Sequence, residues 1–270
     1  MNAELPALWS ALATYTLAGS LAFAGVASGR LPERWVMRLL VLGLALHAVS
    51  IGARWERLGH GPFLTMYEIL SSNVWSLLAI FVLAAWRLPV LRPALAIVLP
   101  LLFVMMLWLA LQDPRAGHLP PTYATALLYV HVGLGKVFLG AVLIAVGLGG
   151  VVLARLTRRG AAWFAALPGD RQLDELAYRF LALALVFETL MLVAGAVWAQ
   201  DAWGRYWAWD PLETWAFLTW LMLVVALHVR STFRPAPPVS AALAIAVFVL
   251  AFLTFFGVPF VTTAPHQGAI

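Results

Sequence analysis

The stretch ATALLYVHVGLGKVFLGAVLIAVGLGGVVLA, residues 124–154, carries a single charged side chain, Lys136. A helix needs about 20 consecutive apolar residues to cross the hydrocarbon core of a bilayer. The stretch is longer than that and is interrupted by neither proline nor a cluster of charges. It therefore predicts a helix that spans a membrane, and it sets the fold class expected for the rest of the chain.

The remainder of the sequence repeats this pattern. Of the 270 residues, 63% are apolar and 11% are charged, whereas soluble proteins contain about 45–50% apolar and about 25% charged residues. Runs long enough to cross a bilayer fall at 7–28, 36–53, 67–86, 94–112, 124–154, 177–199, 212–229 and 239–257. We therefore expect an all-α, polytopic membrane helix bundle of about eight transmembrane helices, forming one integral membrane domain over residues 1–270.

The arginines predict the orientation of these helices. Twelve basic residues lie in the loops that follow the first, third, fifth and seventh runs, and four lie in the alternate loops: Arg54, Arg57, Arg115 and Arg205. Cytoplasmic loops of membrane proteins carry an excess of lysine and arginine. The odd-numbered loops are therefore expected in the cytoplasm and both termini outside. The first run lacks a basic leader and a cleavage site, so we expect it to be a retained span.

Two classes of chemistry are excluded by composition. The chain contains no cysteine, so it forms no disulfide and offers no thiolate to a metal or substrate. Its net charge of +5 comes from arginines scattered at the ends of apolar runs, which is a topology signal rather than a phosphate-binding patch. We expect no nucleic-acid partner.

The most unusual segment is WGRYWAWDPLETW, residues 203–215, between the sixth and seventh runs and on the predicted outer face. Its second half has a structural explanation. Asp210 followed by Pro211 is an N-cap with proline at the first helical position, and Glu213 nearly completes a capping box. The start of the helix does not explain the tryptophans up to Trp209, and these residues indicate a binding surface.

Two histidines lie near this segment in the predicted topology. His131 is about two turns into the fifth run, and His266 follows the last run on the same side. Imidazoles from two different helices beside tryptophans provide what a planar iron cofactor needs, namely axial nitrogen ligands and aromatic walls. Either histidine alone is better explained as an ordinary interfacial residue; together with the tryptophans the two favour a cofactor site.

Two further histidines fall within spans. His228 lies about 24 Å along the seventh run, on a stripe at helical spacing formed by Glu213, Phe217, Trp220, Val224 and His228. A titratable group inside a membrane is a functional candidate by default, although snorkelling beside Arg230 also explains it. His47, in the second run, could face His228, but their estimated depths differ by about 10 Å.

At these residues the sequence resembles the haem-handling cytochrome c assembly proteins with a tryptophan-rich "WWD" signature, of the CcsA/ResC type of system II cytochrome c biogenesis. The resemblance covers most of the chain. It is carried by WGRYWAWDPLETW, the most specific element, together with GHGPFLTMYEIL at 59–70, YVHVGLGK at 129–136, LHVR at 227–230 and a C-terminal FFGV followed by a histidine.

The resemblance implies roles for individual residues. His131 and His266 match the external axial haem ligands, and His228 matches a transmembrane histidine that holds haem on its way outward. The residues that match the signature lining the external haem are Trp203, Gly204, Trp207, Trp209 and Asp210. Arg205 is a candidate for contact with a haem propionate. Leu212 stands where the family commonly has lysine, and His47 is a second candidate transmembrane ligand beside one from a partner subunit.

The function implied is that of a haem lyase (holocytochrome c synthase) subunit acting only with a CcsB/ResB-like membrane partner. It binds haem b, moves it to the outer face of a bacterial-type inner membrane and presents it to the Cys-x-x-Cys-His segment of apocytochrome c. A thioredoxin-like thiol reductase is a further expected partner. The alternatives are a haem exporter or chaperone without ligation activity, like CcmC, and a cytochrome b-type electron-transfer subunit.

Overall fold

The computed structural model describes residues 4–117 and 119–261. Every regular element in these ranges is helical, which confirms the predicted all-α fold. Within these described residues, eight helical segments are long and apolar enough to cross a membrane: Glu4–Ala27, Glu33–Leu58, Met66–Arg87, Pro89–Ala110, Ala126–Ala154, Asp170–Trp203, Pro211–Phe233 and Pro237–Gly257. They correspond one to one with the eight predicted runs. His266 lies outside the described residues.

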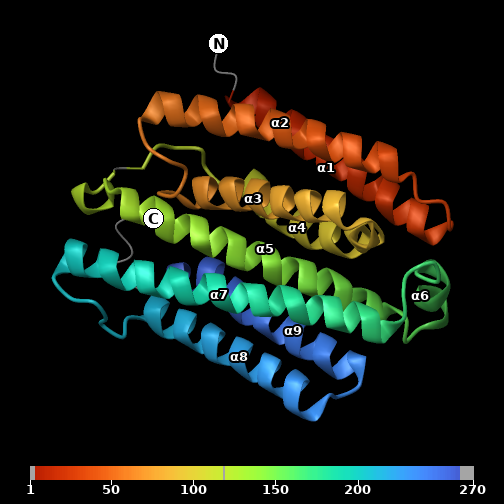
Figure 1. Ribbon diagram of the computed structural model, residues 1–270. Helices are drawn as coiled ribbons and strands as arrows, with labels where there is room; N and C mark the ends of the chain where they lie inside the picture. The colour runs from red at the N-terminus through yellow and green to blue at the C-terminus, as the bar shows by residue number, and fades with distance from the viewer. Residues whose placement is uncertain (1–3, 118, 262–270) are drawn as a thin grey trace. The chain divides into compact units, whose positions relative to one another are not determined.

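The elements follow along the chain as drawn in Figure 1: α1 (Glu4–Ala27), α2 (Glu33–Leu58), α3 (Met66–Arg87), η1 (Pro89–Ala94), α4 (Leu95–Ala110), η2 (Pro121–Tyr123), α5 (Ala126–Ala154), α6 (Arg158–Trp163), α7 (Asp170–Trp203), α8 (Pro211–Phe233), α9 (Pro237–Phe252), η3 (Leu253–Gly257) and α10 (Val258–Val261). Helix α7 begins before the predicted run because its first two turns are polar and still helical. The η3 segment is a π-helical turn.

The chain divides into two compact units. The first comprises Met1–Ala116 and Gly150–Gly169, and the second comprises Gly117–Gly149 and Asp170–Ile270. Helix α5 belongs to both, because the division falls between Gly149 and Gly150. Both glycines lie in the GLGG stretch, and each packs closely against a helix of its own unit. A Cβ added at Gly149 would lie 3.2 Å from Cβ of Ala241, and a Cβ added at Gly150 would lie 2.6 Å from Cγ2 of Ile97. Whether one functional domain covers residues 1–270 stays a prediction.

In the first unit, α1 and α2 form the most extensive helix pair. Gly43 of α2 allows their close approach, since a Cβ there would overlap the ring of Tyr15 in α1. The hydroxyl of Tyr15 lies 3.4 Å from Nδ1 of His47, and Nε2 of His47 lies 2.9 Å from Oγ of Ser71 in α3. His47 is fully buried and thus links three helices through both ring nitrogens.

Replacing Gly43 with alanine is expected to lower the free energy of unfolding by about 1–3 kcal/mol, because the added methyl group must displace a buried aromatic ring. Gly52 in the same helix is a matched control, since a Cβ there meets nothing within 4 Å. Gly52→Ala should be neutral or stabilising by up to about 1 kcal/mol. Apparent melting temperatures in one detergent measure both changes, and equal values would contradict this packing.

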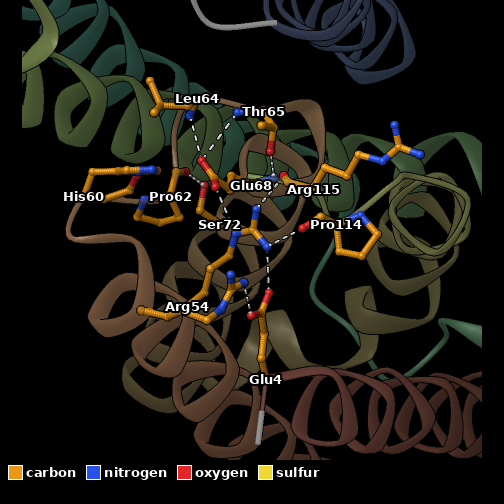
Figure 2. Close-up of polar contacts among 12 residues, drawn as sticks. Glu4, Arg54, His60, Pro62, Leu64, Thr65, Glu68, Ser72, Pro114 and Arg115 are labelled. Carbon is orange, nitrogen blue, oxygen red and sulfur yellow. Dashed lines mark hydrogen bonds and ion pairs between the residues drawn. The ribbon is translucent and has the colours of Figure 1, made fainter. Parts of the chain in front are cut away.

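A buried ion-pair cluster joins four segments of the first unit around Arg54 (Figure 2). Its guanidinium donates from Nε to Glu68 at 2.9 Å and from Nη1 to Glu4 at 2.7 Å. It also donates to the backbone carbonyls of Pro114 and Arg115, each at 2.9 Å. All three charged side chains are less than 10% exposed. The cluster fixes the start of α1, the end of α2, the start of α3 and the segment after α4.

Glu68 has a second task in this cluster, which is to cap α3. Its Oε2 accepts hydrogen bonds from the backbone N–H groups of Leu64 and Thr65, and the Thr65 hydroxyl accepts from the N–H of Glu68. This is a capping box. The buried carboxylate therefore has backbone donors as well as Arg54, which offsets part of the cost of removing it from water.

In the second unit, α7 packs on α8, and α8 packs on α9 (Figure 1). Arg230 of α8 donates to Asp174 of α7 at 2.6 Å, near the end of α8. Deeper in the pair of α8 and η3, the hydroxyls of Thr219 and Thr254 lie 3.0 Å apart and are buried. These polar contacts set the register of helices whose facing surfaces are otherwise apolar.

Candidate functional site

The tryptophan-rich segment (residues 203–215) joins α7 to α8 through an irregular stretch. Its backbone passes through the left-handed region twice, at Gly204 (φ 73°) and at Trp209 (φ 59°). Glycine adopts this conformation freely, whereas a bulky aromatic residue does so only when the surrounding structure holds it there. Strained backbone of this kind is typical of functional sites. Trp209 is also 66% exposed, so its position is not explained by burial in a core.

Aromatic rings continue from this segment along one face of α8. Trp207 meets Trp209 edge to face with ring centroids 5.6 Å apart, and Trp209 meets Phe217 at 6.0 Å. Phe217 then stacks on Trp220 at 6.0 Å with an interplanar angle of 10°. The predicted stripe along this helix therefore places its aromatic residues in contact.

The start of α8 holds the segment in place. Asp210 caps the helix by accepting from the N–H of Glu213 at 2.9 Å. Glu213 Oε2 accepts from the N–H groups of Ala208, at 2.7 Å, and Asp210, at 3.3 Å. The predicted capping box with proline at the first position is confirmed. The hydrogen bond from the N–H of Ala208 to Glu213 holds the backbone between Trp207 and Trp209. The helix cap therefore also restrains the two tryptophans that flank Ala208.

His131 projects from α5 against α7. Its Nδ1 lies 2.9 Å from the backbone carbonyl of Met191. A carbonyl oxygen only accepts, so Nδ1 carries the proton and, in the neutral ring, Nε2 carries the lone pair. The ring stacks on Trp198 with centroids 6.2 Å apart and an angle of 28°. Histidines that ligate metals are commonly oriented in this way by a backbone carbonyl on the other nitrogen.

Gly195 makes room for this imidazole. A Cβ at Gly195 would lie 2.8 Å from Cε1 and 2.9 Å from Nδ1 of His131. Gly195→Ala is therefore expected to push the ring away and lengthen its bond to Met191. If His131 ligates haem, as the sequence resemblance implies, the absorption spectrum of added haem should shift in this variant while the histidine is retained. Gly133→Ala in α5, which meets nothing within 4 Å, is the control, and identical spectra for the two variants would count against this placement of His131.

Trp198 is a site residue that the sequence did not single out. It is 2% exposed, contacts Trp203 at 5.0 Å and Tyr123 at 5.1 Å between ring centroids, and donates from Nε1 to the carbonyl of Thr122 at 3.0 Å. Burial raises the pKa of Tyr123 to about 12, so this neighbour stays uncharged. The signal that could have revealed the His131-facing surface is the spacing of Met191, Gly195 and Trp198 along one face of α7.

The other predicted residues are more dispersed. His228 is exposed on α8, with Nδ1 at 3.5 Å from Oγ1 of Thr232 and its ring at the edge of Phe233. Arg205 and Gly204 are exposed in the tryptophan-rich segment, and Trp203 is half-buried. His47 lies in the first unit with both ring nitrogens engaged. This geometry favours a structural role for His47, and its role as a ligand stays a prediction.

The comparisons with known proteins agree with one another. The family model described as Cytochrome C assembly protein matches residues 63–266. A protein of Prochlorococcus marinus (strain MIT 9312) called Cytochrome c biogenesis protein CcsA is 29% identical over 259 residues, covering 86% of this chain and 84% of the relative. A protein of the same name from Chlamydomonas reinhardtii is 29% identical over 220 residues, covering 79% of this chain and 62% of the relative.

A solved structure also shares the fold. The chain superimposes on Cytochrome c Heme Lyase CcmF with a TM-score of 0.72 at 20% identity, covering 95% of this chain and 47% of the CcmF chain. This protein thus spans about half the length of CcmF. At this identity the likeness shows the fold, while the match of the family model to most of the chain shows descent. The chain belongs to the cytochrome c assembly protein family, and its resemblance to the CcsA type is confirmed.

Proposed function

We propose that this protein binds haem, brings it to the outer face of the membrane and presents it for covalent attachment to apocytochrome c, as the CcsA-type subunit of a cytochrome c synthase. The observation that carries the proposal is the setting of His131. Its Nδ1 donates to the carbonyl of Met191, so in the neutral ring Nε2 carries the lone pair that an iron ligand would use. The ring is held between Gly195 and Trp198, next to the tryptophan-rich segment.

The residues present fit a haem. Nε1 of Trp207 is buried and has no hydrogen-bond partner among the described residues, and a buried donor without a partner is costly. A haem propionate is an acceptor that would satisfy it. The exposed ring of Trp209 and the half-buried ring of Trp203 supply aromatic faces, and exposed Arg205 supplies a cation for a second carboxylate.

The role proposed for the chain is to hold a haem and to orient it. His131 would supply one nitrogen ligand to the iron of a bound haem, and we propose that His266 would supply a second. The tryptophans exclude water from the macrocycle, and the capped start of α8, with Asp210, keeps them in place. Haem supplies the vinyl groups to which the two thiols of a Cys-x-x-Cys-His segment add. Because this chain has no cysteine, both thiols come from the substrate, and catalysis consists of proximity and orientation.

The loading of haem is assigned to the C-terminal end of α8. We propose that His228, exposed on that helix, receives haem from the cytoplasmic side. Its counterpart is a ligand on a CcsB/ResB-like partner subunit, since both ring nitrogens of His47 are already engaged within the first unit. The cargo is proposed to be haem b, the membrane a bacterial-type inner membrane, and a thioredoxin-like reductase the source of reduced substrate thiols.

Co-expression tests the proposal. The full chain is produced with a CcsB-type subunit and an apocytochrome c, and the cytochrome is analysed for covalently bound haem after denaturation. Holocytochrome is expected only when both membrane subunits are present. If the purified chain carries haem and no partner yields holocytochrome, the exporter interpretation replaces this one. If the chain instead exchanges electrons rapidly and reversibly with quinol, an electron-transfer subunit is indicated.

A further inference from the structure

The last span is interrupted by η3 (Leu253–Gly257), a π-helical turn between α9 and α10 that has no task in the function proposed above. Pro259 accounts for its formation. A proline inside a helix has no N–H to donate, and its ring collides with the carbonyl of the residue four positions earlier, which here is Phe255. The chain forms a wider turn instead, in which the N–H of Val258 donates to the carbonyl of Leu253, five residues earlier.

Such a turn is costly inside a membrane. The N–H of Val258 is engaged with Leu253, and Pro259 has none. The carbonyl of Thr254 is thereby deprived of both of its usual helical donors. Within a span, proline and the backbone groups that it frees are tolerated where the surrounding protein compensates for them. Single π-helical turns are also frequent at functional sites. The turn therefore requires an explanation beyond the packing of the last helix.

The turn directs two successive side chains to two different helices. Thr254 is buried, and its hydroxyl lies 3.0 Å from that of Thr219 in α8. Phe255 faces α5 instead. Its ring centroid lies 6.2 Å from that of Phe138, and a Cβ at Gly135 would lie 3.4 Å from both its Cε1 and its Cζ. A π turn contains more residues than an α turn, so neighbouring side chains diverge by a smaller angle and both reach the interior.

The place that Phe255 reaches belongs to the face of α5 that carries His131. Gly135 and Phe138 follow His131 by four and seven residues, so all three lie on one face of the helix. Met191 of α7 reaches the same place, because a Cβ at Gly135 would lie 2.9 Å from its Sδ. The backbone carbonyl of Met191 is also the acceptor for Nδ1 of His131. Met191 thus carries both the side chain that packs at Gly135 and the carbonyl that orients the imidazole.

We propose that Phe255, presented by the π-helical turn, is a positioning residue for His131. Its ring fills the space at Gly135 beside the thioether of Met191, and it so holds the turn of α7 whose carbonyl sets the tautomer and direction of the imidazole. The inference rests on the proposed function and deepens it, because it extends the support of the haem ligand to the last span. Phe255 acts through Met191 and is assigned no contact with haem. This task explains why the span contains Pro259.

Pro259→Ala separates positioning from stability. Alanine at this position supplies the missing N–H and removes the collision, so a regular helix can form and turn Phe255 away from Gly135. The apparent melting temperature of the haem-free full chain in detergent is expected to stay level or to rise. Haem affinity, measured from the Soret band as haem is titrated in, is expected to fall about tenfold, the lower end of the effect of mutating residues that orient a metal ligand.

Further variants act at the contact itself. Phe255→Ala empties the space at Gly135 and Gly135→Ala crowds it, so both should lower haem affinity by about the same factor and shift the Soret maximum. Phe255→Leu, which keeps a branched apolar side chain, should lie between Phe255→Ala and the native protein. The matched controls are Leu253→Ala, in the same turn but 39% exposed, and Gly133→Ala, where a Cβ meets nothing within 4 Å. Both should bind haem as the native protein does.

The inference is overturned if Phe255→Ala and Pro259→Ala bind haem with native affinity and spectrum. It is equally overturned if Pro259→Ala loses haem only together with a melting temperature below the native value, since damage to the bundle would then be the cause. His131→Ala in the same titration separates the two hypotheses. Native haem binding by that variant defeats the proposed function, whereas loss there with native binding by Phe255→Ala and Pro259→Ala defeats only this inference.

Discussion

Replacing His131 with alanine is expected to lower the haem affinity of the purified protein by more than about a hundredfold. Mutating residues that merely orient a metal ligand typically costs ten- to a hundredfold in affinity, and here the proposed ligand itself is removed. The carbonyl of Met191 would lose its side-chain donor, and the space between Gly195 and Trp198 would be left without a ring. Haem content after purification and the Soret spectrum measure the change.

Chemical rescue makes this prediction specific. In His131→Gly, added imidazole should occupy the vacated space and restore the spectrum of a nitrogen-ligated haem, which a misfolded protein could not do. Gly133→Ala provides a neighbouring α5 variant without a predicted defect, because a Cβ there meets nothing within 4 Å. Full haem occupancy with an unaltered spectrum in His131→Ala would remove the basis for the ligand assignment.

The largest stability effect is expected at Arg54. Arg54→Met removes the cation from a cluster in which Glu4 and Glu68 are both buried. Breaking a buried ion pair by deleting one partner costs about 3–5 kcal/mol, since a buried charge is left without compensation. The carbonyls of Pro114 and Arg115 lose a donor as well. At roughly 2–4 °C per kcal/mol, the apparent melting temperature should fall by about 10 °C.

Two comparisons test the cause of that loss. Arg57 also binds Glu4, at 2.6 Å, but its side chain is 40% exposed, so Arg57→Met should cost no more than about 1 kcal/mol. The triple variant Glu4→Gln, Arg54→Met, Glu68→Gln removes all three charges together and should be more stable than Arg54→Met alone. If the triple variant is the least stable of the set, uncompensated charge is not the reason for the loss.

The fold was largely predictable because the bilayer imposes a simple requirement. A span must satisfy its own backbone and expose apolar side chains, so the eight runs could be found from composition and length. The start of α8 was equally local, since Asp210, Pro211 and Glu213 form a capping box within four residues. Division of α5 between two units was not predictable, because it depends on which helices each half of α5 contacts.

The site was predictable in its parts and not in its arrangement. His131 could be selected as a candidate ligand from type and depth, but its tautomer depends on a carbonyl 60 residues away. The same holds for Arg54, whose partner Glu4 is 50 residues distant. Gly195 and Trp198 carry no sequence signal as single residues. Their role appears only when α5 is placed beside them.

The Arg54 cluster has a consequence for biogenesis. Its acceptors come from the beginning of α1, the beginning of α3 and the chain segment that follows α4. The guanidinium thus finds all of its acceptors only once four spans have been threaded through the bilayer and residue 115 has arrived on the same side as Glu4. Closure of the cluster therefore depends on residues 4–115 alone and can follow the insertion of the first four spans.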